Sequence, residues 1–481
     1  MASGATHEEW IDEVVSDLGG YLAGQRWFHS PQAPGRDELS VVRATRLSAS
    51  GVTYPLWQVL VGVGGETYQM ILGTRAEKDF TEGRDRGDSR PARGDSSAAR
   101  GAGDLASMVA SVGGLAIHDA LSDPESALAL LECISGGSQR AERCRLITTE
   151  QSNTSVIYDD RLILKVFRRL RPGRNPDAEV TSALAAAGFA NVAAPLVEWG
   201  DDDYDFAFGQ SYLAGGADGW ALALASLREF YSLYSNPGRH GPGEAGGDFG
   251  HEATRLGQVT ARMHMHLTRI FPGASDEEVA GSWAGLIESI RRRLVAASGA
   301  VGRDLEGPVA SLLERVAGFG TPGPAIRVHG DLHLGQVMRT DLGWFVLDFE
   351  GEPDRTLSER LAPASPLKDV AGMLRSLHYA SRYSLSERDR SEWPGLQPAA
   401  LAWELHNREA FLEGYRSEPG IEVLLPDARS MADVMSVYEL DKALYELDYE
   451  LAHRPEWVEI PMDALERLGL TNERSVDSSG A

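Results

Sequence analysis

The segment that decides the fold reads His329-Gly330-Asp331-Leu332-His333-Leu334-Gly335-Gln336 and follows a short apolar stretch, residues 325–328. A carboxylate such as that of Asp331 can orient a hydroxyl group and accept its proton late in an attack on phosphorus. Gln336 offers a neutral side-chain oxygen, which is a ligand type for divalent cations. The segment therefore predicts that Asp331 is a catalytic base and that Gln336 binds a metal ion.

A second acidic segment, Asp348-Phe349-Glu350-Gly351-Glu352, follows the strand-like run at residues 344–347. A carboxylate at the end of a strand, with another close behind it, is a suitable ligand pair for Mg²⁺. Each of these residues alone would more often be a helix cap or a surface group. The base, the amide and the strand-end acid occur together in the order that phosphoryl transfer requires. We therefore predict Asp348 and Glu350 as further magnesium ligands, with ATP as the phosphoryl donor.

The charge balance excludes several classes of partner. The chain has 46 Lys and Arg residues against 71 Asp and Glu residues, a formal net charge of −25. Nucleic acid and anionic lipid both need a basic footprint, so neither is an expected partner. Cys133 and Cys144 lack a metal-ligand spacing, which indicates reduced thiols. The N-terminus has no signal-peptide pattern and no apolar run reaches about 20 residues, so we expect a cytoplasmic protein.

Strand-like sequence dominates the first part of the chain and helix-like sequence the second. Residues 80–104 are rich in Gly, Arg, Asp and Ser, which predicts a disordered loop, whereas residues 106–131 are apolar-periodic, which predicts a helix. Residues 236–250, rich in Gly and Pro, predict an exposed loop. Strands before helices is the order of a two-lobed kinase. The expected strands are 41–47, 54–63, 66–73, 149–158, 161–167 and 204–212, and the expected helices begin near 175 and continue through 222–234, 251–270, 276–297 and 366–451.

Residues 328–337 resemble the catalytic loop of the aminoglycoside phosphotransferase and choline kinase group. The longer strings at 344–353 and 365–376 are similar to those of the actinobacterial maltokinases, which phosphorylate maltose at its anomeric carbon. The resemblance extends over almost the whole chain apart from roughly residues 80–104 and 236–246. It includes Gly24-Gln25-Arg26-Trp27-Phe28 and Ala116 to Glu125, which resemble a cap, and Tyr438 to Trp457, which resemble the end helices.

The resemblance implies an α+β, two-lobed, protein-kinase-like fold with an N-terminal cap subdomain. The cap would span residues 1–131, the kinase N-lobe 132–212 and the helical C-lobe 213–481. In this group the first Asp of the loop is the base, an Asn or Gln binds magnesium, and an Asp downstream is the second metal ligand, which matches Asp331, Gln336 and Asp348.

The resemblance also implies a nucleotide site. The run Glu150 to Val156 is similar to the maltokinase phosphate-binding loop, where small polar residues let backbone N–H groups approach phosphate. Lys165 would contact the α- and β-phosphates, with Glu179 as its partner, and residues 210–213 would form the inter-lobe linker that binds adenine. The ATP-binding residues implied are Ser152, Asn153, Thr154, Ser155, Lys165, Glu179, Gln210 and Tyr212.

An acceptor site is expected near the C-terminus. At helical spacing Tyr438, Asp441, Tyr445 and Asp448 fall along one face. Acids and aromatic rings on one face suit a sugar, and they equally suit a helix that packs on the lobe with a charged outer side. The residues expected to contact the acceptor sugar are His329, His333, Tyr438, Glu439, Asp441 and Arg454.

The maltokinase resemblance implies transfer of the ATP γ-phosphoryl group to maltose O1, without a phosphoenzyme. A close branch phosphorylates glucosamine instead, giving glucosamine 6-phosphate, and Glu439, Asp441 or Glu446 could each meet the amine. The cap departs from the maltokinase pattern, since Trp27-Phe28 is followed by His29-Ser30-Pro31 rather than a Gly-Lys or Gly-Arg turn.

Two other functions are disfavoured. A non-catalytic subunit would normally have lost the base, the metal acid or the strand lysine, all of which are present. An aminoglycoside-resistance kinase would share the loop but not the string at 438–443. A trehalose synthase or another glycogen-pathway enzyme is a candidate partner through the resemblance.

Overall fold

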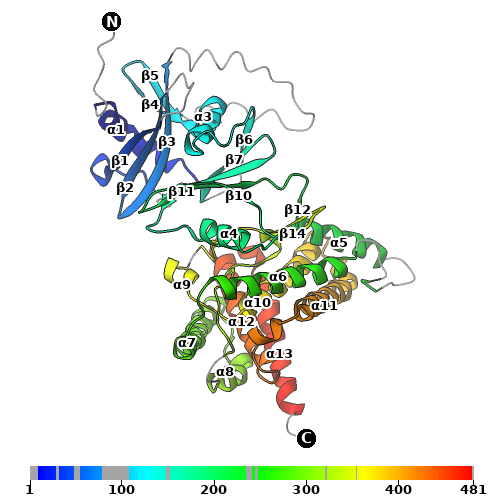
Figure 1. The fold of residues 1–481 in the computed structure, drawn as a ribbon. Coiled ribbons are helices and arrows are strands. Elements are labelled where there is room, and N and C mark those ends of the chain that lie inside the picture. The colour runs from blue at the N-terminus through cyan, green and yellow to red at the C-terminus, as the bar shows by residue number, and fades with distance from the viewer. Residues whose placement is uncertain are drawn as a thin grey trace. The chain divides into compact units, whose positions relative to one another are not determined.

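The computed structural model describes residues 9–28, 32–47, 55–77, 108–147, 152–234, 241–243, 248–319, 322–353 and 355–478. The loop predicted at 80–104 lies outside these residues, as does most of the loop predicted at 236–250. The chain divides into two compact units, one made of Met1–Glu179 with Ala194–Ala214 and the other of Val180–Ala193 with Gly215–Ala481 (Figure 1). Strands dominate the first unit and helices the second, in agreement with the predicted α+β class.

The first unit opens with helix α1 (Glu9–Ala23) and an antiparallel sheet. Its strand order is β1-β2-β3-β5-β4, and the short β9 also pairs with β3. Gly64 and Gly65 adopt positive φ angles of 57° and 85° at the turn between β2 and β3, which correspond to the strands predicted at 54–63 and 66–73. The strands are β1 (Leu39–Leu47), β2 (Leu56–Val63), β3 (Glu66–Ala76), β4 (Met108–Val112), β5 (Leu115–Asp119) and β9 (Arg169–Leu170).

The helix predicted at 106–131 is wrong over its first half. Residues 108–119 form the hairpin β4–β5, and the turn is made by Gly113 and Gly114 at φ 57° and 82°. Two successive glycines favour this turn and disfavour a helix, a signal that outweighs the apolar periodicity. The helix begins only at α3 (Pro124–Ile134), where the Asp123 carboxylate caps it by accepting from the Ser126 N–H.

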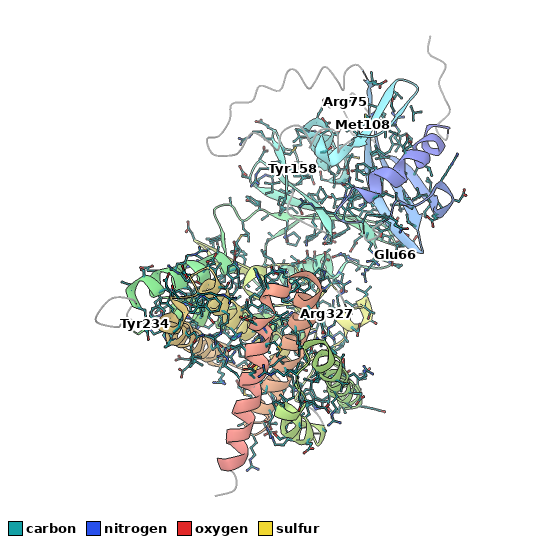
Figure 2. All side chains as sticks on the ribbon, turned by 180° about the vertical axis from the view of Figure 1, so that it is seen from behind. Glu66, Arg75, Met108, Tyr158, Tyr234 and Arg327 are labelled. Atoms are coloured by element: carbon teal, nitrogen blue, oxygen red, sulfur yellow. The ribbon has the colours of Figure 1, made fainter. Side chains whose placement is uncertain are left out.

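A second antiparallel sheet of the first unit has the order β10-β11-β8-β7-β6 and contains the predicted strand pair at residues 149–167. Asp159 and Asp160, both at positive φ, make the two-residue turn between β7 and β8. Tyr158, labelled in Figure 2, is fully buried in a core that the two sheets share. The strands are β6 (Cys144–Ile147), β7 (Asn153–Tyr158), β8 (Leu162–Phe167), β10 (Pro195–Gly200) and β11 (Asp205–Ser211).

The cap motif packs around a buried charge. The Arg168 guanidinium donates to Asp119 Oδ2 at 2.6 Å and lies over the ring of Trp27, with 5.1 Å from Cζ to the ring centroid. The Tyr21 hydroxyl donates to the same Asp119 oxygen at 2.9 Å. The two segments that resemble a cap therefore meet at Arg168, just beyond strand β8.

The second unit is mainly helical, and its central helices α5, α6, α10, α11 and α12 lie against one another (Figure 1). A small sheet consists of β12 (Ala217–Asp218), β13 (Val337–Thr340) and β14 (Gly343–Val346), and the segment 329–336 leads directly into β13. The helices are α5 (Gly219–Tyr234), α6 (Gly250–Ile270), α7 (Asp276–Val301), α8 (Ala310–Ala317), α9 (Leu357–Leu361), α10 (Leu367–Ser386), α11 (Trp393–Ser417), α12 (Met431–His453) and α13 (Glu459–Ser478); helix α4 (Pro176–Ala186) crosses the boundary between the units.

The predicted helices at 222–234, 251–270 and 276–297 are confirmed as α5, α6 and α7, and the region 366–451 holds α10, α11 and α12. Their apolar faces form one large core with the loop residues Val328, Leu332 and Leu334. The described part of the chain contains no helix that is long and apolar enough to cross a membrane.

Candidate active site

Helix α10 holds the start of the segment 329–336 in place. The buried carboxylate of Asp369 accepts from the backbone N–H groups of His329, at 2.8 Å, and Gly330, at 2.9 Å. Asp369 Oδ2 also lies 3.0 Å from His264 Nε2. Burial alone would raise the pKa of Asp369, but its hydrogen bonds and the two nearby histidines keep this pKa below the ordinary value. An ionised carboxylate therefore fixes the backbone just before Asp331.

His329 shapes the loop from inside. Its ring is buried, and its Nε2 lies 2.9 Å from the carbonyl oxygen of Leu347, while its Nδ1 faces the Asp331 N–H at 3.3 Å. The ring also packs on Phe349, with 4.8 Å between centroids. His329 therefore links the Asp331 turn to the acidic segment that begins at Asp348.

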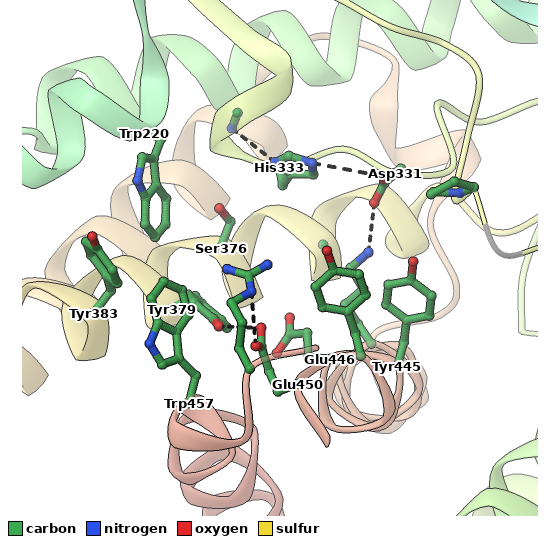
Figure 3. Close-up of a pocket in the computed structure, with 16 residues that line it drawn as sticks. Trp220, Asp331, His333, Ser376, Tyr379, Tyr383, Tyr445, Glu446, Glu450 and Trp457 are labelled. Carbon is green, nitrogen blue, oxygen red and sulfur yellow. Dashed lines mark hydrogen bonds and ion pairs between the residues drawn. The ribbon is translucent and has the colours of Figure 1, made fainter. Parts of the chain in front are cut away.

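A lysine from helix α12 holds the predicted base. The Lys442 ammonium donates to Asp331 Oδ1 and to Glu352 Oε1, both at 2.8 Å. Figure 3 shows this contact as a dashed line at Asp331, with a second line to His333, whose Nε2 lies 3.9 Å from Asp331 Oδ2. Glu352 also accepts from Arg355 Nε at 2.6 Å. One half-buried ammonium thus joins the predicted base to the acidic segment.

Lys442 and Glu352 keep each other ionised. Burial alone would lower the pKa of Lys442, but the negative charges of Asp331 and Glu352 raise it above the ordinary value. Burial alone would raise the pKa of Glu352, but Lys442, Lys368 and Arg355 hold it well below the usual range. Asp331 consequently faces a fixed positive charge on one side.

The predicted metal ligands come together in the second unit. Gln336 ends a short 3₁₀ turn, and its Nε2 donates to Asp348 Oδ2 at 3.3 Å. A carboxylate oxygen of Asp348 lies within 4.8 Å of one of Glu350. Asp348 has a left-handed φ of 62°, an unusual conformation for an aspartate that sits at the end of strand β14. An amide oxygen and two carboxylates fit the oxygen-rich donor set that Mg²⁺ prefers.

Asp331 opens into a pocket of about 520 Å³, which we name the Asp331 pocket (Figure 3). Helices α10 and α12 supply most of its wall. Its charged and titratable lining residues are Asp331, His333, Lys442, Glu446, Glu450 and Arg454, and its aromatic lining residues are Trp220, Tyr379, Tyr383, Tyr445, Tyr449 and Trp457. A concave site of this size, with aromatic walls and a few polar groups, is typical of small-molecule binding.

Glu450 is the acid of this pocket with spare acceptor capacity. Its side chain is buried, and its Oε1 accepts from the Tyr379 hydroxyl at 2.6 Å. Its Oε2 has no hydrogen-bond donor among the described residues and lies 3.5 Å from Arg454 Nε. Glu446, in contrast, is bound by the buried guanidinium of Arg375. A buried carboxylate oxygen without a donor is costly unless a ligand supplies one.

The residues expected at the acceptor are not all brought together. His333 and Arg454 line the Asp331 pocket, whereas His329 is buried behind the loop. Tyr438 and Asp441 line a different pocket. Glu439 is buried against Arg408, which donates to both of its carboxylate oxygens, at 3.0 and 2.8 Å.

The implied nucleotide residues belong to the first unit. Ser155 on β7 stands opposite Lys165 on β8, and the Lys165 ammonium donates to Asp177 Oδ2 at 2.9 Å. Asp177 is thus a lysine partner that the sequence analysis missed, two residues before the expected Glu179 in the same helix. Thr154 accepts from Arg168 Nε at 2.8 Å.

The remaining residues of this set lie at the ends of strands. Ser152 precedes β7, Asn153 begins it and Gln210 lies near the end of β11. The Tyr212 hydroxyl accepts from Arg145 at 3.0 Å, and the Tyr212 N–H donates to the Arg161 carbonyl at 2.8 Å.

Sequence reasoning missed three charged residues of the site in the second unit. Lys442 is a basic residue inside an acidic run, Tyr438-Glu439-Leu440-Asp441-Lys442, and this was a usable signal. Asp369 follows Lys368 but is itself followed by the apolar run Val370 to Leu374, and an acid at the start of such a run is typical of a carboxylate with a buried partner. Nothing in the local sequence distinguishes Glu450 from the other acids of its helix.

Known proteins resemble this chain along most of its length. Residues 143–399 match the phosphotransferase enzyme family. The glucosamine kinase of Streptacidiphilus jiangxiensis is 30% identical over 337 residues, which cover 66% of this chain and 71% of that protein. The glucosamine kinase of Mycolicibacterium smegmatis is 28% identical over 351 residues, which cover 70% of this chain and 82% of that protein.

A solved structure shows the fold. A glucosamine kinase in complex with glucosamine, ADP and inorganic phosphate is similar over 95% of this chain and 98% of its own, with a TM-score of 0.64 and 21% sequence identity. The likeness confirms the predicted kinase-like fold class. The relatives carry the name of the alternative acceptor, glucosamine, rather than that of maltose. The chain belongs to the phosphotransferase enzyme family and is an ATP-dependent phosphotransferase.

Proposed function

We propose that this protein transfers the γ-phosphoryl group of ATP to the 6-hydroxyl of glucosamine, giving glucosamine 6-phosphate and ADP. The observation that carries the proposal is the buried Glu450 Oε2, which has no hydrogen-bond donor among the described residues and lies in the same pocket as Asp331. An ammonium group supplies three donors and a positive charge, so it matches this oxygen better than a hydroxyl group does. Similarity to proteins named glucosamine kinase supports the same acceptor.

The chemistry rests on Asp331. Its carboxylate would accept a hydrogen bond from the acceptor hydroxyl and take the proton as the oxygen bonds to the γ-phosphorus and the bond to ADP breaks. Lys442 and the backbone that Asp369 holds would orient this carboxylate. Gln336, Asp348 and Glu350 would hold Mg²⁺. When bound, the ion would neutralise negative charge on the phosphate groups.

The aromatic residues give the pocket a second recognition element. Tyr379, Tyr383 and Trp457 form a contiguous group, with ring centroids 6.2 Å apart for Tyr379–Trp457 and 5.1 Å apart for Tyr383–Trp457. Their faces offer apolar surface to the C–H face of a sugar ring, while the acids meet its polar substituents. This pairing supports a sugar rather than a purely apolar alcohol.

An acceptor panel tests the proposal. Initial rates with ATP and magnesium are compared for glucosamine, maltose, glucose and an aminoglycoside. We expect the highest kcat/KM for glucosamine. A higher kcat/KM for maltose would reject the proposed acceptor and favour maltose 1-phosphate as the product.

Two variants tie the result to the site. Asp331→Asn should reduce kcat by several orders of magnitude while ATP still binds, and wild-type turnover would reject Asp331 as the base. Glu450→Gln should lower kcat/KM for glucosamine by about tenfold or more, since a hydrogen bond to a charged group is worth about 1.5–3 kcal/mol. The same change should affect glucose much less. Glu456→Gln, an exposed acid next to Trp457 and outside the pocket lining, is the matched control.

A further inference from the structure

A second pocket lies on the other side of helix α12. It has a volume of about 340 Å³ and shares no lining residue with the Asp331 pocket. Tyr438 and Asp441 face it from α12, and Trp283 and Leu286 face it from α7. We name it the Trp283 pocket. The proposed phosphoryl transfer uses none of its lining residues.

Two cations in this pocket make no direct contact with an acid, although Lys368 lies near enough to Glu352 and Glu359 to lower their pKa values. Arg292 and Lys368 both line it, and neither side chain makes a hydrogen bond or ion pair with any residue in the described ranges. The two acids of the lining are already engaged. Glu359 accepts from the N–H and hydroxyl of Thr356, and Asp441 accepts from Arg293 and Arg355. The three cations of the lining, Arg292, Arg355 and Lys368, outnumber its two acids in a chain whose net charge is −25, and this local excess of positive charge in a concavity indicates an anionic ligand.

The walls of the pocket indicate an organic body on that anion. Trp283 is buried and its indole N–H is used by the Val316 carbonyl, so its ring offers only apolar surface to the pocket. Tyr438 packs beside it, with 5.9 Å between ring centroids. Arg and Lys side chains bind phosphate through charge-assisted hydrogen bonds, and aromatic walls hold a ring or carbon chain.

The Trp283 pocket is connected to the catalytic base through ion pairs. Arg355 lines the pocket and donates to Asp441 at 3.0 Å and to Glu352 at 2.6 Å. Glu352 in turn accepts from Lys442, which holds Asp331. An anion in the pocket would compete with Glu352 for Arg355 and so alter the charge balance on Lys442.

We propose that the Trp283 pocket binds a small phosphate monoester through Arg292, Lys368 and Arg355, and that its occupancy changes turnover at Asp331. The phosphate supplies the direct anionic contact that Arg292 and Lys368 lack, and the carbon body lies against Trp283. The site is separate from the acceptor and donor sites of the proposed reaction.

Titration calorimetry with glucose 6-phosphate, inorganic phosphate and glucose tests the binding. We expect saturable binding of both phosphates, tighter for the ester, and weaker or no binding of glucose. In Arg292→Gln/Lys368→Gln the affinity for glucose 6-phosphate should fall at least about tenfold, because two charge-assisted bonds are lost. Equal affinity in this variant, or no saturable phosphate binding in the wild type, would overturn the proposal.

Matched variants separate this pocket from the others. Arg291→Gln changes the neighbouring arginine of α7, which does not line the pocket, and should leave the affinity within about twofold. Glu450→Gln, in the Asp331 pocket, should also leave it unchanged, so a loss there would assign the binding to the acceptor site. If the double variant does not fold, the single variant Arg292→Gln, at an exposed position, is measured instead, and its affinity for glucose 6-phosphate should also be lower than that of the wild type. Saturating glucose 6-phosphate should change kcat in the wild type but not in the double variant; binding without any change in kcat would overturn the coupling.

Discussion

A single ammonium group, that of Lys442, stands between the half-buried carboxylate of Asp331 and the buried carboxylate of Glu352. Removing it would leave Asp331 without its fixed contact and would place two negative charges near each other. We therefore propose that the lysine positions Asp331 as the base and also stabilises the fold. These two roles can be separated by experiment.

Lys442→Met is expected to lower the free energy of unfolding by about 3–5 kcal/mol, the usual cost of breaking a buried ion pair by removing one partner. It should also reduce kcat more than it raises the KM for ATP, because the base loses its orientation. Unfolding in urea and steady-state rates measure the two effects. The double variant Lys442→Met/Glu352→Gln removes one of the stranded charges, so it should recover part of the stability and little of the activity; recovery of both would contradict the positioning role.

Gly372 allows α10 to approach the catalytic segment closely. A Cβ built at this glycine would lie 2.6 Å from the Leu332 carbonyl oxygen, which belongs to the backbone and cannot move aside easily. Gly372→Ala should therefore destabilise the protein by about 1–3 kcal/mol and lower kcat, since Leu332 adjoins Asp331. Thermal unfolding and initial rates test this. Gly281→Ala, at an open position in α7, is the control and should be neutral or up to about 1 kcal/mol stabilising.

At the scale of elements, helix α12 lines two pockets with two different sets of residues. Lys442, Tyr445, Glu446 and Tyr449 follow the i, i+3, i+4, i+7 spacing and line the Asp331 pocket. Tyr438 and Asp441 point into the Trp283 pocket instead. The expected acceptor face, Tyr438-Asp441-Tyr445-Asp448, therefore combined residues of two pockets. Tyr438 and Tyr445 lie within about 20° of each other around the helix axis but about 10 Å apart along it, so they reach different pockets.

Glu352 links the acidic segment to α12 through its ion pair with Lys442. This ion pair should make the stability of the protein depend on pH. The folded pKa of Glu352 is held below its ordinary value of about 4.3, so the unfolded chain binds more protons as the pH falls. Its stabilising contribution is present above about pH 4 and is lost at lower pH. The wild type should consequently lose more stability between about pH 5 and pH 3 than Glu352→Gln does.

Urea unfolding midpoints at several pH values measure this difference. At neutral pH Glu352→Gln should be the less stable of the two. Glu409→Gln, an exposed acid on α11, is the matched control and should parallel the wild type. If the unfolding midpoints of Glu352→Gln and the wild type fell in parallel with pH, the ion pair of Glu352 would not contribute to acid sensitivity.

For the whole molecule, the dominant electrostatic feature is the excess of 71 acidic over 46 basic residues. Like charges repel one another in the compact state, and salt screens that repulsion. Raising NaCl from about 0.02 M to about 0.5 M, where the Debye length falls below about 5 Å, should therefore raise Tm. Differential scanning calorimetry provides the measurement. A lower Tm at high salt would mean that the ion pairs screened by salt outweigh the net repulsion.

The sequence by itself determined the chemistry and most of the elements. Asp331, Gln336, Asp348 and Glu350 could be predicted as base and metal ligands because phosphoryl transfer needs these residue types in this order, and because their neighbours in sequence form the loop and strand that hold them. Strands such as β7 and β8 were predictable for the same reason, since alternation and turn residues are local signals. At residues 108–119 the apolar periodicity predicted a helix and the two glycines a turn, and the structure has the turn, within a hairpin.

Only the tertiary structure decided which charged side chains meet. Lys442 is 111 residues from Asp331, and Asp369 is 40 residues from His329, so no local pattern could pair them. The same holds for Glu450, because the absence of a hydrogen-bond donor to its Oε2 among the described residues can be seen only when burial and the Tyr379 contact are known. A helix can present each of its faces to a different pocket, and which face meets which pocket depends on the packing of its neighbours rather than on its own sequence.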